Sequence, residues 1–201
     1  MEEGHLDVDP LKAVKPGATW RRERILTPDE RTRIKAAVLH APFRNFLTFL
    51  ELTGCRPFSE ACAVTADMVD WEAGSITFVK HKNARKGKTR VVYLAPALVP
   101  LLKEWCRTRP KGPLFTNRRG NVYNRSNVTT TVRNLERRLA MPRWNLYSWR
   151  HSWFSDALER GVPAALLAEI GGNSPATLNK YYNHLDQKKA ALKQAAADAV
   201  G

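Results

Sequence analysis

Two arginines and one late tyrosine are of the types needed to attack a phosphodiester without a metal ion: Arg56, Arg150 and Tyr182. A guanidinium group stays charged and donates two parallel hydrogen bonds to the oxygens of a phosphate. A phenol, with a pKa of ~10, attacks only when nearby groups stabilise its negative charge and its proton is removed. These residues therefore predict phosphoryl transfer in which the tyrosine is the nucleophile.

Short motifs surround these residues. They are Thr53-Gly54-Cys55-Arg56, Tyr147-Ser148-Trp149-Arg150-His151, Ile170-Gly171-Gly172-Asn173 and Tyr181-Tyr182-Asn183-His184. In order and spacing they resemble the catalytic domain of the tyrosine recombinases, or phage-type integrases, from about Leu26 to about Leu185. The resemblance implies an α+β, mainly helical fold with a small antiparallel β-sheet. It also implies site-specific strand exchange on double-stranded DNA through a 3′-phosphotyrosyl link, with no metal ion or other cofactor.

The first motif departs from the family pattern by an insertion. The resemblance makes Arg56 the first catalytic arginine and Glu60 a supporting acid. An acidic residue usually stands three positions after this arginine, whereas Glu60 stands four after it because Pro57-Phe58-Ser59 intervene. Considered alone, Arg56 could equally form a structural ion pair with Glu60.

The later motifs carry two substitutions. Arg150 matches the second catalytic arginine, but Tyr147 replaces the histidine that usually opens this motif. Tyr147 can donate a hydrogen bond to a phosphate oxygen, or pack in the core. His151 is expected to support the helix. Asn173 replaces a histidine or tryptophan, and its amide can donate to a phosphate oxygen but cannot exchange protons.

Two adjacent tyrosines compete for the role of nucleophile. The spacing from Gly172 and from Arg150, together with the trailing His184 as a supporting residue, favours Tyr182 over Tyr181. The alternative is an aromatic pair that serves helix packing.

A very basic segment between two expected strands resembles the hairpin that delivers a catalytic lysine in the family. Lys86, just before Gly87, is the best match for a general acid that protonates the leaving 5′ oxygen, and Lys82 is the alternative. A charge run of this kind could instead contact backbone phosphates only. The expected DNA contacts, here and further along the chain, are Lys80, Lys82, Arg85, Lys88, Arg118 and Arg119.

The composition favours a polyanionic partner. The chain has 33 Lys and Arg against 19 Asp and Glu, a formal net charge of +14, which indicates nucleic acid first and an acidic membrane surface second. No apolar stretch reaches the ~18 residues of a membrane span, and the acidic N-terminus is unlike a signal peptide. Cys55, Cys62 and Cys106 lack metal-ligand spacing and are expected to be small, buried and reduced. We expect a cytoplasmic, nucleoid-associated protein.

Three segments are expected along the chain. Residues 1–26 resemble an interdomain linker, 27–185 form the catalytic domain and 186–201 form a helical tail. In the family this tail often docks on a neighbouring protomer, which implies a tetramer on DNA built from a chain that is monomeric in solution. A tail that stays with its own chain, or frays, is the alternative. Family members usually carry an N-terminal helical domain that clamps DNA, and without one we expect weak, salt-dependent binding.

Local signals predict the individual elements. Thr27-Pro28-Asp29-Glu30 marks a helix start with a capping box, and Gly54 suits the end of the helix that follows. A basic hairpin is expected to join the first two strands. The expected strands are 75–79, 90–94 and a short one at 114–116. The expected helices after the first are 43–52, 59–64, 95–107, 126–140, 148–160, 163–170, 175–184 and 187–199.

Other function classes fit part of the pattern. A DNA-binding relative that has lost its chemistry would explain Tyr147 and Asn173, but it would not need Arg56, Arg150 and Tyr182 together. A type IB topoisomerase, which relaxes DNA by similar chemistry, is a second alternative. An RNA-binding protein has only the charge in its favour.

Overall fold

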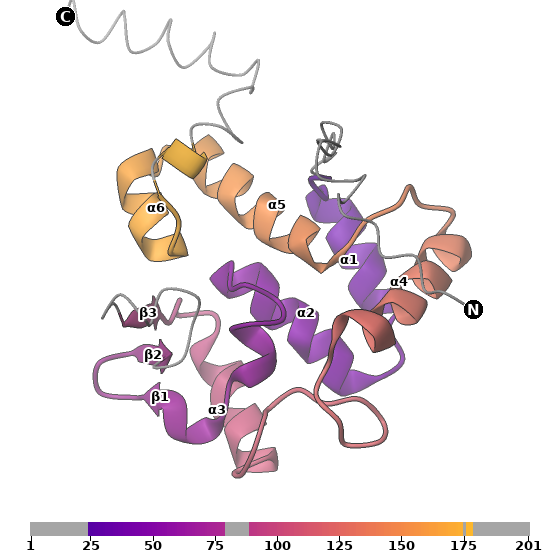
Figure 1. Ribbon diagram of the computed structural model, residues 1–201, viewed down its shortest axis with the longest axis horizontal. Coiled ribbons are helices and arrows are strands. Elements are labelled where there is room, and N and C mark those ends of the chain that lie inside the picture. The colour runs from indigo at the N-terminus through magenta and orange to yellow at the C-terminus, as the bar shows by residue number, and fades with distance from the viewer. Residues whose placement is uncertain (1–23, 79–88, 175, 179–201) are drawn as a thin grey trace, which may run out of the picture.

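A computed structural model describes residues 24–78, 89–174 and 176–178 of the chain (Figure 1). The expected fold class is confirmed, because helices dominate and a small antiparallel sheet accompanies them. The helices are α1 (Pro28–Ala37), α2 (Ala41–Thr53), α3 (Val99–Thr108), α4 (Arg125–Leu139), α5 (Leu146–Glu159) and α6 (Ala164–Gly171), with 3₁₀ turns η1 (Ala61–Ala63) and η2 (Ala66–Met68). The strands are β1 (Val69–Asp70), β2 (Ser75–Phe78) and β3 (Arg90–Tyr93).

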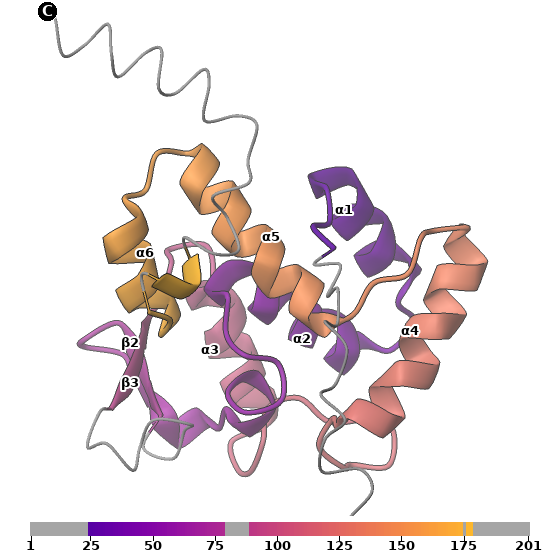
Figure 2. The same ribbon diagram turned by 45° about the horizontal axis from the view of Figure 1, so that its top comes forward.

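The sheet lies at one end of the domain and α4 at the other, with α2 between them (Figures 1 and 2). Its strand order is β1-β2-β3, and both pairs are antiparallel. Ile76 pairs with Val92 and Phe78 pairs with Arg90. The pairing therefore fixes Arg90 on the face of β3 that also carries the buried Val92.

The core forms mainly between α2 and α5. Phe46, Phe49 and Leu50 of α2 and Trp149 of α5 are fully buried. Gly54 ends α2 in the left-handed conformation, at φ 60°, and an added Cβ there would lie 2.4 Å from the Trp153 ring. The chain after α2 therefore runs directly against α5, which brings the first arginine motif beside the second.

Capping residues set the helix starts. Thr27 accepts from the backbone of Glu30, and the Glu30 carboxylate accepts from the backbone of Thr27, so the predicted capping box is confirmed. Asn145 caps α5 by accepting from Tyr147 N at 2.8 Å. This cap starts α5 at Leu146, two residues before the predicted start, so Arg150 lies in its second turn.

Three sequence predictions of local structure were wrong. The helix expected over 59–64 is the 3₁₀ turn η1, because the chain from Arg56 turns more tightly around the Glu60 carboxylate. The strand expected at 114–116 forms only isolated bridges, since Asn117 accepts from two following backbone amides and reverses the chain. The helix expected from residue 95 begins at Val99, and β1 was not predicted.

Several predictions lie outside the described residues. These are the segment 1–23, the basic hairpin 79–88, the helix expected over 175–184 apart from residues 176–178, and the tail 187–199. In the part of the chain that the structure describes, no helix combines the length and apolar character needed to cross a membrane.

The cysteines are unpaired thiols. Cys55 and Cys62 are buried, as expected, whereas Cys106 is half-buried. Burial raises the pKa of the Cys55 thiol and of the Cys62 thiol to about 12. Both thiols therefore stay protonated at neutral pH and serve as small core residues.

Candidate active site: an arginine cluster beside a basic cavity

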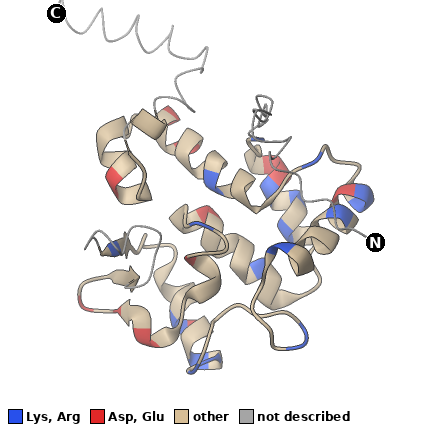
Figure 3. Cartoon of the chain, in the orientation of Figure 1, with Lys and Arg blue, Asp and Glu red and all other residues tan. Residues whose placement is uncertain are grey.

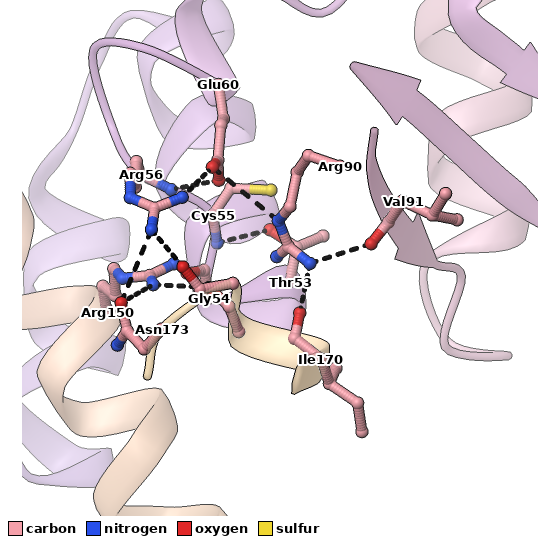
Figure 4. Close-up of polar contacts among 12 residues, drawn as sticks. Thr53, Gly54, Cys55, Arg56, Glu60, Arg90, Val91, Arg150, Ile170 and Asn173 are labelled. Carbon is pink, nitrogen blue, oxygen red and sulfur yellow. Dashed lines mark hydrogen bonds and ion pairs between the residues drawn. The ribbon is translucent and has the colours of Figure 1, made fainter. Parts of the chain in front are cut away.

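Arg56 lies in the loop after α2 and is held by Glu60 (Figure 4). The Glu60 carboxylate, fully buried, accepts from Arg56 Nη1 at 2.5 Å and from Arg56 N at 2.8 Å. The ion pair between Arg56 and Glu60 that the sequence suggested therefore forms across the insertion. Arg56 nevertheless lies in a cluster with Arg90 and Arg150. The second terminal nitrogen of Arg56, Nη2, donates to the carbonyl of Gly172.

Arg150 projects from α5 into the same region. It is 4% exposed, and it donates from Nη1 to the carbonyl of Gly54 and from Nη2 to the carbonyl of Gly171 at 2.6 Å. Its guanidinium carbon lies 4.9 Å from the centroid of the Phe154 ring. Burial, followed by the nearby charge of Arg56, lowers the pKa of Arg150 to about 10. The group therefore remains a cation near neutral pH.

Asn173 is the point at which the two motif arginines converge (Figure 4). Its Oδ1 accepts from Arg150 Nη2 at 3.1 Å and lies 3.5 Å from Arg56 Nη2. Arg56 and Asn173 are 117 residues apart in the sequence, so only the fold joins them. An oxygen bound by two guanidinium groups in this way marks a place that suits an anionic oxygen.

Arg90 joins the cluster although the sequence motifs did not identify it. It projects from β3, is 5% exposed, and donates from Nη1 to the carbonyl of Val91 at 2.8 Å and to the carbonyl of Ile170. Its Nε lies 3.7 Å from Glu60 Oε1. The signal was present, because strand alternation places an arginine on the same face as the apolar Val92.

The charges in the cluster do not balance. Arg56, Arg90 and Arg150 surround the single carboxylate of Glu60. These four groups therefore carry an excess of positive charge in surroundings largely shielded from water. An anion beside them would be attracted more strongly than at an exposed surface, because a low-dielectric environment strengthens charge interactions.

A cavity of about 650 Å³ opens beside the cluster, between α4 and α5. Arg56, Arg150 and Asn173 line one part of it, and Glu136 is the single acidic residue among its described lining residues. The Glu136 carboxylate accepts from Trp144 N at 2.7 Å, so it is already engaged. Further arginines in the lining, none of them identified from the sequence, are Arg24, Arg125, Arg133 and Arg143. The cavity is thus strongly basic.

One face of α4 supplies much of this charge. Arg125, Thr129 and Arg133 recur every four residues, which places them on the same side of the helix, and all three line the cavity. Basic residues are visible along α4 and on α5 in Figure 3. This four-residue recurrence is the sequence signal that would have revealed the surface.

The two departures near Arg56 and Arg150 meet in the structure. Tyr147 lines the cavity, and its ring centroid lies 6.4 Å from that of Phe58, a residue of the inserted loop. The guanidinium of Arg125 lies 5.6 Å from the Phe58 ring on α4's side of the cavity. Tyr147 is half-buried beside the cavity rather than packed in the main core.

The remaining predicted residues fall into three groups. His151 also lines the basic cavity, one residue beyond Arg150 on α5. Arg118 and Arg119 instead line a second cavity, of about 640 Å³, together with Arg138 of α4. The predicted residues that lie outside the described part of the chain are Lys80, Lys82, Arg85, Lys86, Lys88, Tyr182 and His184.

Comparison with known proteins places the chain in a family. The model of the phage integrase family matches residues 24–189, so the chain belongs to that family. It is 26% identical to a tyrosine recombinase XerC-like protein of Caldanaerobacter subterraneus subsp. tengcongensis, with 94% of this chain and 59% of the relative covered. It is 23% identical to the tyrosine recombinase XerA of Pyrococcus horikoshii, with 91% and 64% covered. The chain therefore spans about three fifths of the length of these curated relatives.

Solved structures share the fold. The crystal structure of XerA recombinase superposes with a TM-score of 0.68 at 23% identity, covering 87% of this chain and 64% of that one. The Tn1549 transposon integrase in complex with a circular intermediate DNA gives a TM-score of 0.69 at 15% identity, covering 86% and 66%. The fold is thus that of tyrosine recombinase catalytic domains.

Proposed function

We propose that the chain is the catalytic part of a site-specific DNA recombinase. The observation that carries this proposal is the convergence of Arg56 and Arg150 on one oxygen, Asn173 Oδ1, beside a basic cavity. Two fixed guanidinium groups are what a phosphodiester needs for its non-bridging oxygens as charge builds up in the transition state. Family membership supports the same conclusion.

In this mechanism Tyr182 attacks the phosphorus of the scissile phosphodiester. The phenol loses its proton to solvent as a bond forms between the phenolic oxygen and phosphorus. The bond to the 5′ oxygen breaks, and a 3′-phosphotyrosyl link results. Lys86, or alternatively Lys82, protonates the leaving 5′ oxygen. A 5′ hydroxyl of another strand then attacks the phosphorus of this link. The bond to the Tyr182 phenolic oxygen breaks, the phenol takes up a proton, and a phosphodiester is restored. Arg56 and Arg150 hold the phosphate throughout, and no step requires a metal ion.

The DNA would lie across the basic cavity. We expect Arg125, Arg133 and Arg143, which line the cavity, to contact the phosphates on either side of the scissile one. Four protomers would assemble on two duplexes through the tail 186–201, and the free chain would be monomeric. Binding would be strongly salt-dependent, because each phosphate contact releases counterions. Such an enzyme would act at the nucleoid, in the cytoplasm.

Covalent trapping tests the proposal without knowledge of the target sequence. Nicked duplexes prepared from the genome that encodes the chain are incubated with the protein, and covalent complexes are recovered under denaturing conditions and sequenced. We expect adducts with the unaltered chain and none with Tyr182→Phe, while Tyr181→Phe keeps them. Adducts lost only with Tyr181→Phe would move the nucleophile by one position.

The same protein preparation separates the alternatives. A relative that only binds DNA would shift duplexes in a gel yet give no adduct, an outcome that the replacement residues Tyr147 and Asn173 make worth testing. An enzyme that only relaxes DNA would relax a supercoiled plasmid but would not exchange strands between two trapped duplexes. Recombinant products that depend on Tyr182 support the proposal over both.

A further inference from the structure

We propose that Arg90 is a positioning residue that holds Glu60 and the end of α6 together and so sets the spacing of Arg56 and Arg150. This proposal rests on the proposed function. Arg90 is 5% exposed and is not among the residues that line the basic cavity. It therefore acts on the phosphate only through the residues it holds.

Three consecutive carbonyls at the C-terminal end of α6 accept hydrogen bonds from the three arginines of the cluster. The carbonyls of residues 170, 171 and 172 accept from Arg90, Arg150 and Arg56, in that order. The last carbonyls of a helix lack partners within the helix and carry its negative partial charge. Each arginine comes from a different part of the chain, so the end of α6 is the template that brings them together.

Glu60 provides the second attachment. Its Oε1 accepts from Arg56 Nη1 at 2.5 Å and lies 3.7 Å from Arg90 Nε. Arg90 thus bridges Glu60 on one side and the end of α6 on the other. This needs the fork of a guanidinium, because the single ammonium of a lysine cannot face both sides at once.

Arg90 and Arg56 both pack closely against Gly172. A Cβ built on Gly172 would lie 3.0 Å from Arg90 Nε and 3.3 Å from Arg56 Nη1. Gly172 also adopts φ 65°, the left-handed region in which glycine is favoured. Because Arg90 and Arg56 both lie against Gly172, a displacement of Arg90 is expected to shift the backbone that holds Arg56.

One terminal nitrogen of Arg90 is engaged by the fold. Nη1 donates to two carbonyls, while Nε and Nη2 have no hydrogen-bond acceptor among the described residues. The remaining charge of Arg90 is directed at Glu60, whose Oε1 lies 3.7 Å from Nε.

The experiment compares Arg90→Met and Arg90→Lys with Arg31→Met. Arg31 is equally buried and ion-paired, with Glu51 and Asp156, but it does not line the cavity. Two readouts are taken: single-turnover adduct formation on a trapped nicked duplex, and the affinity for orthovanadate, a phosphate mimic that needs no target sequence. Thermal unfolding is recorded for every variant.

We expect both Arg90 variants to form the adduct about 100-fold more slowly, the loss typical of a small misplacement of groups around a reacting centre. Vanadate affinity should fall about 10-fold by the same reasoning. Arg31→Met should lower the unfolding temperature comparably yet stay within about twofold of the unaltered chain in both readouts, because distant sites act independently.

A double-mutant cycle with Arg56→Ala decides the route of action. If Arg90 works through Arg56, Arg90→Met adds little once Arg56 is absent. Fully additive losses, or Arg90 variants that match the unaltered chain in both readouts, would overturn the inference. An unaltered chain that binds vanadate through Arg56 but never forms an adduct would defeat the proposed function, while the vanadate cycle would still decide the role of Arg90.

Discussion

Replacing Asn173 by aspartate should change stability and activity in opposite directions. Asn173 Oδ1 accepts from Arg150 Nη2 at 3.1 Å and lies 3.5 Å from Arg56 Nη2. Aspartate has nearly the same shape, so Asn173→Asp puts a carboxylate oxygen where the amide oxygen lies. The two guanidinium groups then hold a built-in anion in the place proposed for the phosphate.

The stability gain follows from the two contacts. The amide oxygen of Asn173 already accepts from the charged guanidinium of Arg150, and a hydrogen bond to a charged group contributes ~1.5–3 kcal/mol. The carboxylate adds a charge attraction to the 3.1 Å contact and so turns it into an ion pair, while the 3.5 Å contact to Arg56, at the limit of a hydrogen bond, adds little. The free energy of unfolding should therefore rise by ~1–2 kcal/mol, which raises the melting temperature by ~2–4 °C per kcal/mol.

The gain should depend on pH in a known direction. The arginines hold the pKa of the new carboxyl below its unfolded value, so the folded state binds fewer protons. The extra stability should therefore be present at pH 7 and be lost as the pH falls below ~4, when the carboxyl is protonated. Thermal unfolding of Asn173→Asp and of the unaltered chain at pH 7 and pH 3.5 checks this.

Activity should fall because the site is already filled. Adduct formation should drop ~100-fold or more, the loss usual when one stabilising donor is taken from a transition state. Asn134→Asp is the matched control: Asn134 accepts from Arg137 at 2.5 Å, so the charge change is the same, but it does not line the basic cavity. An Asn173→Asp protein that is less stable yet fully active would refute the convergence of the two arginines on this oxygen.

Three further outcomes follow from the same contacts. Glu60→Gln should destabilise the fold by ~3–5 kcal/mol, since it leaves buried arginines unpaired, and calorimetry measures this. Gly172→Ala should cost at least ~1–2 kcal/mol for its left-handed conformation and also weaken vanadate binding, because its Cβ would press on Arg90 and Arg56. At pH 8 iodoacetamide should label Cys106 faster than Cys55 or Cys62, as mass spectrometry of the intact and digested chain would show.

Each of these has a contrary result. A Glu60→Gln protein as stable as the parent would mean that the carboxylate does not balance the cluster. Gly172→Ala with unchanged vanadate affinity would mean that the end of α6 yields without moving the arginines. Rapid labelling of Cys55 in the folded chain, with all three thiols labelled equally in denaturant, would contradict its burial beside Arg56.

The sequence motifs singled out two arginines of the described cluster but not the arrangement of the cluster. Arg56 and Arg150 stand in local motifs, so residue type and spacing were enough to find them. Arg90 stands in no motif, and its role comes from contacts with Glu60 and with Ile170, which is 80 residues away. Spacing along a chain carries no information on such contacts, although the alternation of β3 showed that an arginine would face inward.

The predictions of local structure failed where side chains took the place of regular backbone hydrogen bonds. Glu60 accepts from Arg56 N and tightens the chain into a 3₁₀ turn, although the composition of 59–64 favoured a helix. Asn145 caps α5 before Ser148, which carries an equally suitable side chain and instead bonds back to Asn145 N at 3.2 Å. Choices between such near-equivalent caps depend on what the helix packs against.

The insertion after Arg56 and the substitution at Tyr147 belong together. The inserted loop supplies Phe58, whose ring centroid lies 6.4 Å from that of Tyr147 on α5. The guanidinium of Arg125, on α4, lies 5.6 Å from the same Phe58 ring. A histidine at residue 147 would offer this ring a smaller and more polar partner, whereas a tyrosine keeps both an apolar face for Phe58 and a hydroxyl that can donate. The two departures from the family pattern therefore form one local solution, in which the longer loop and the larger side chain build the same wall of the cavity.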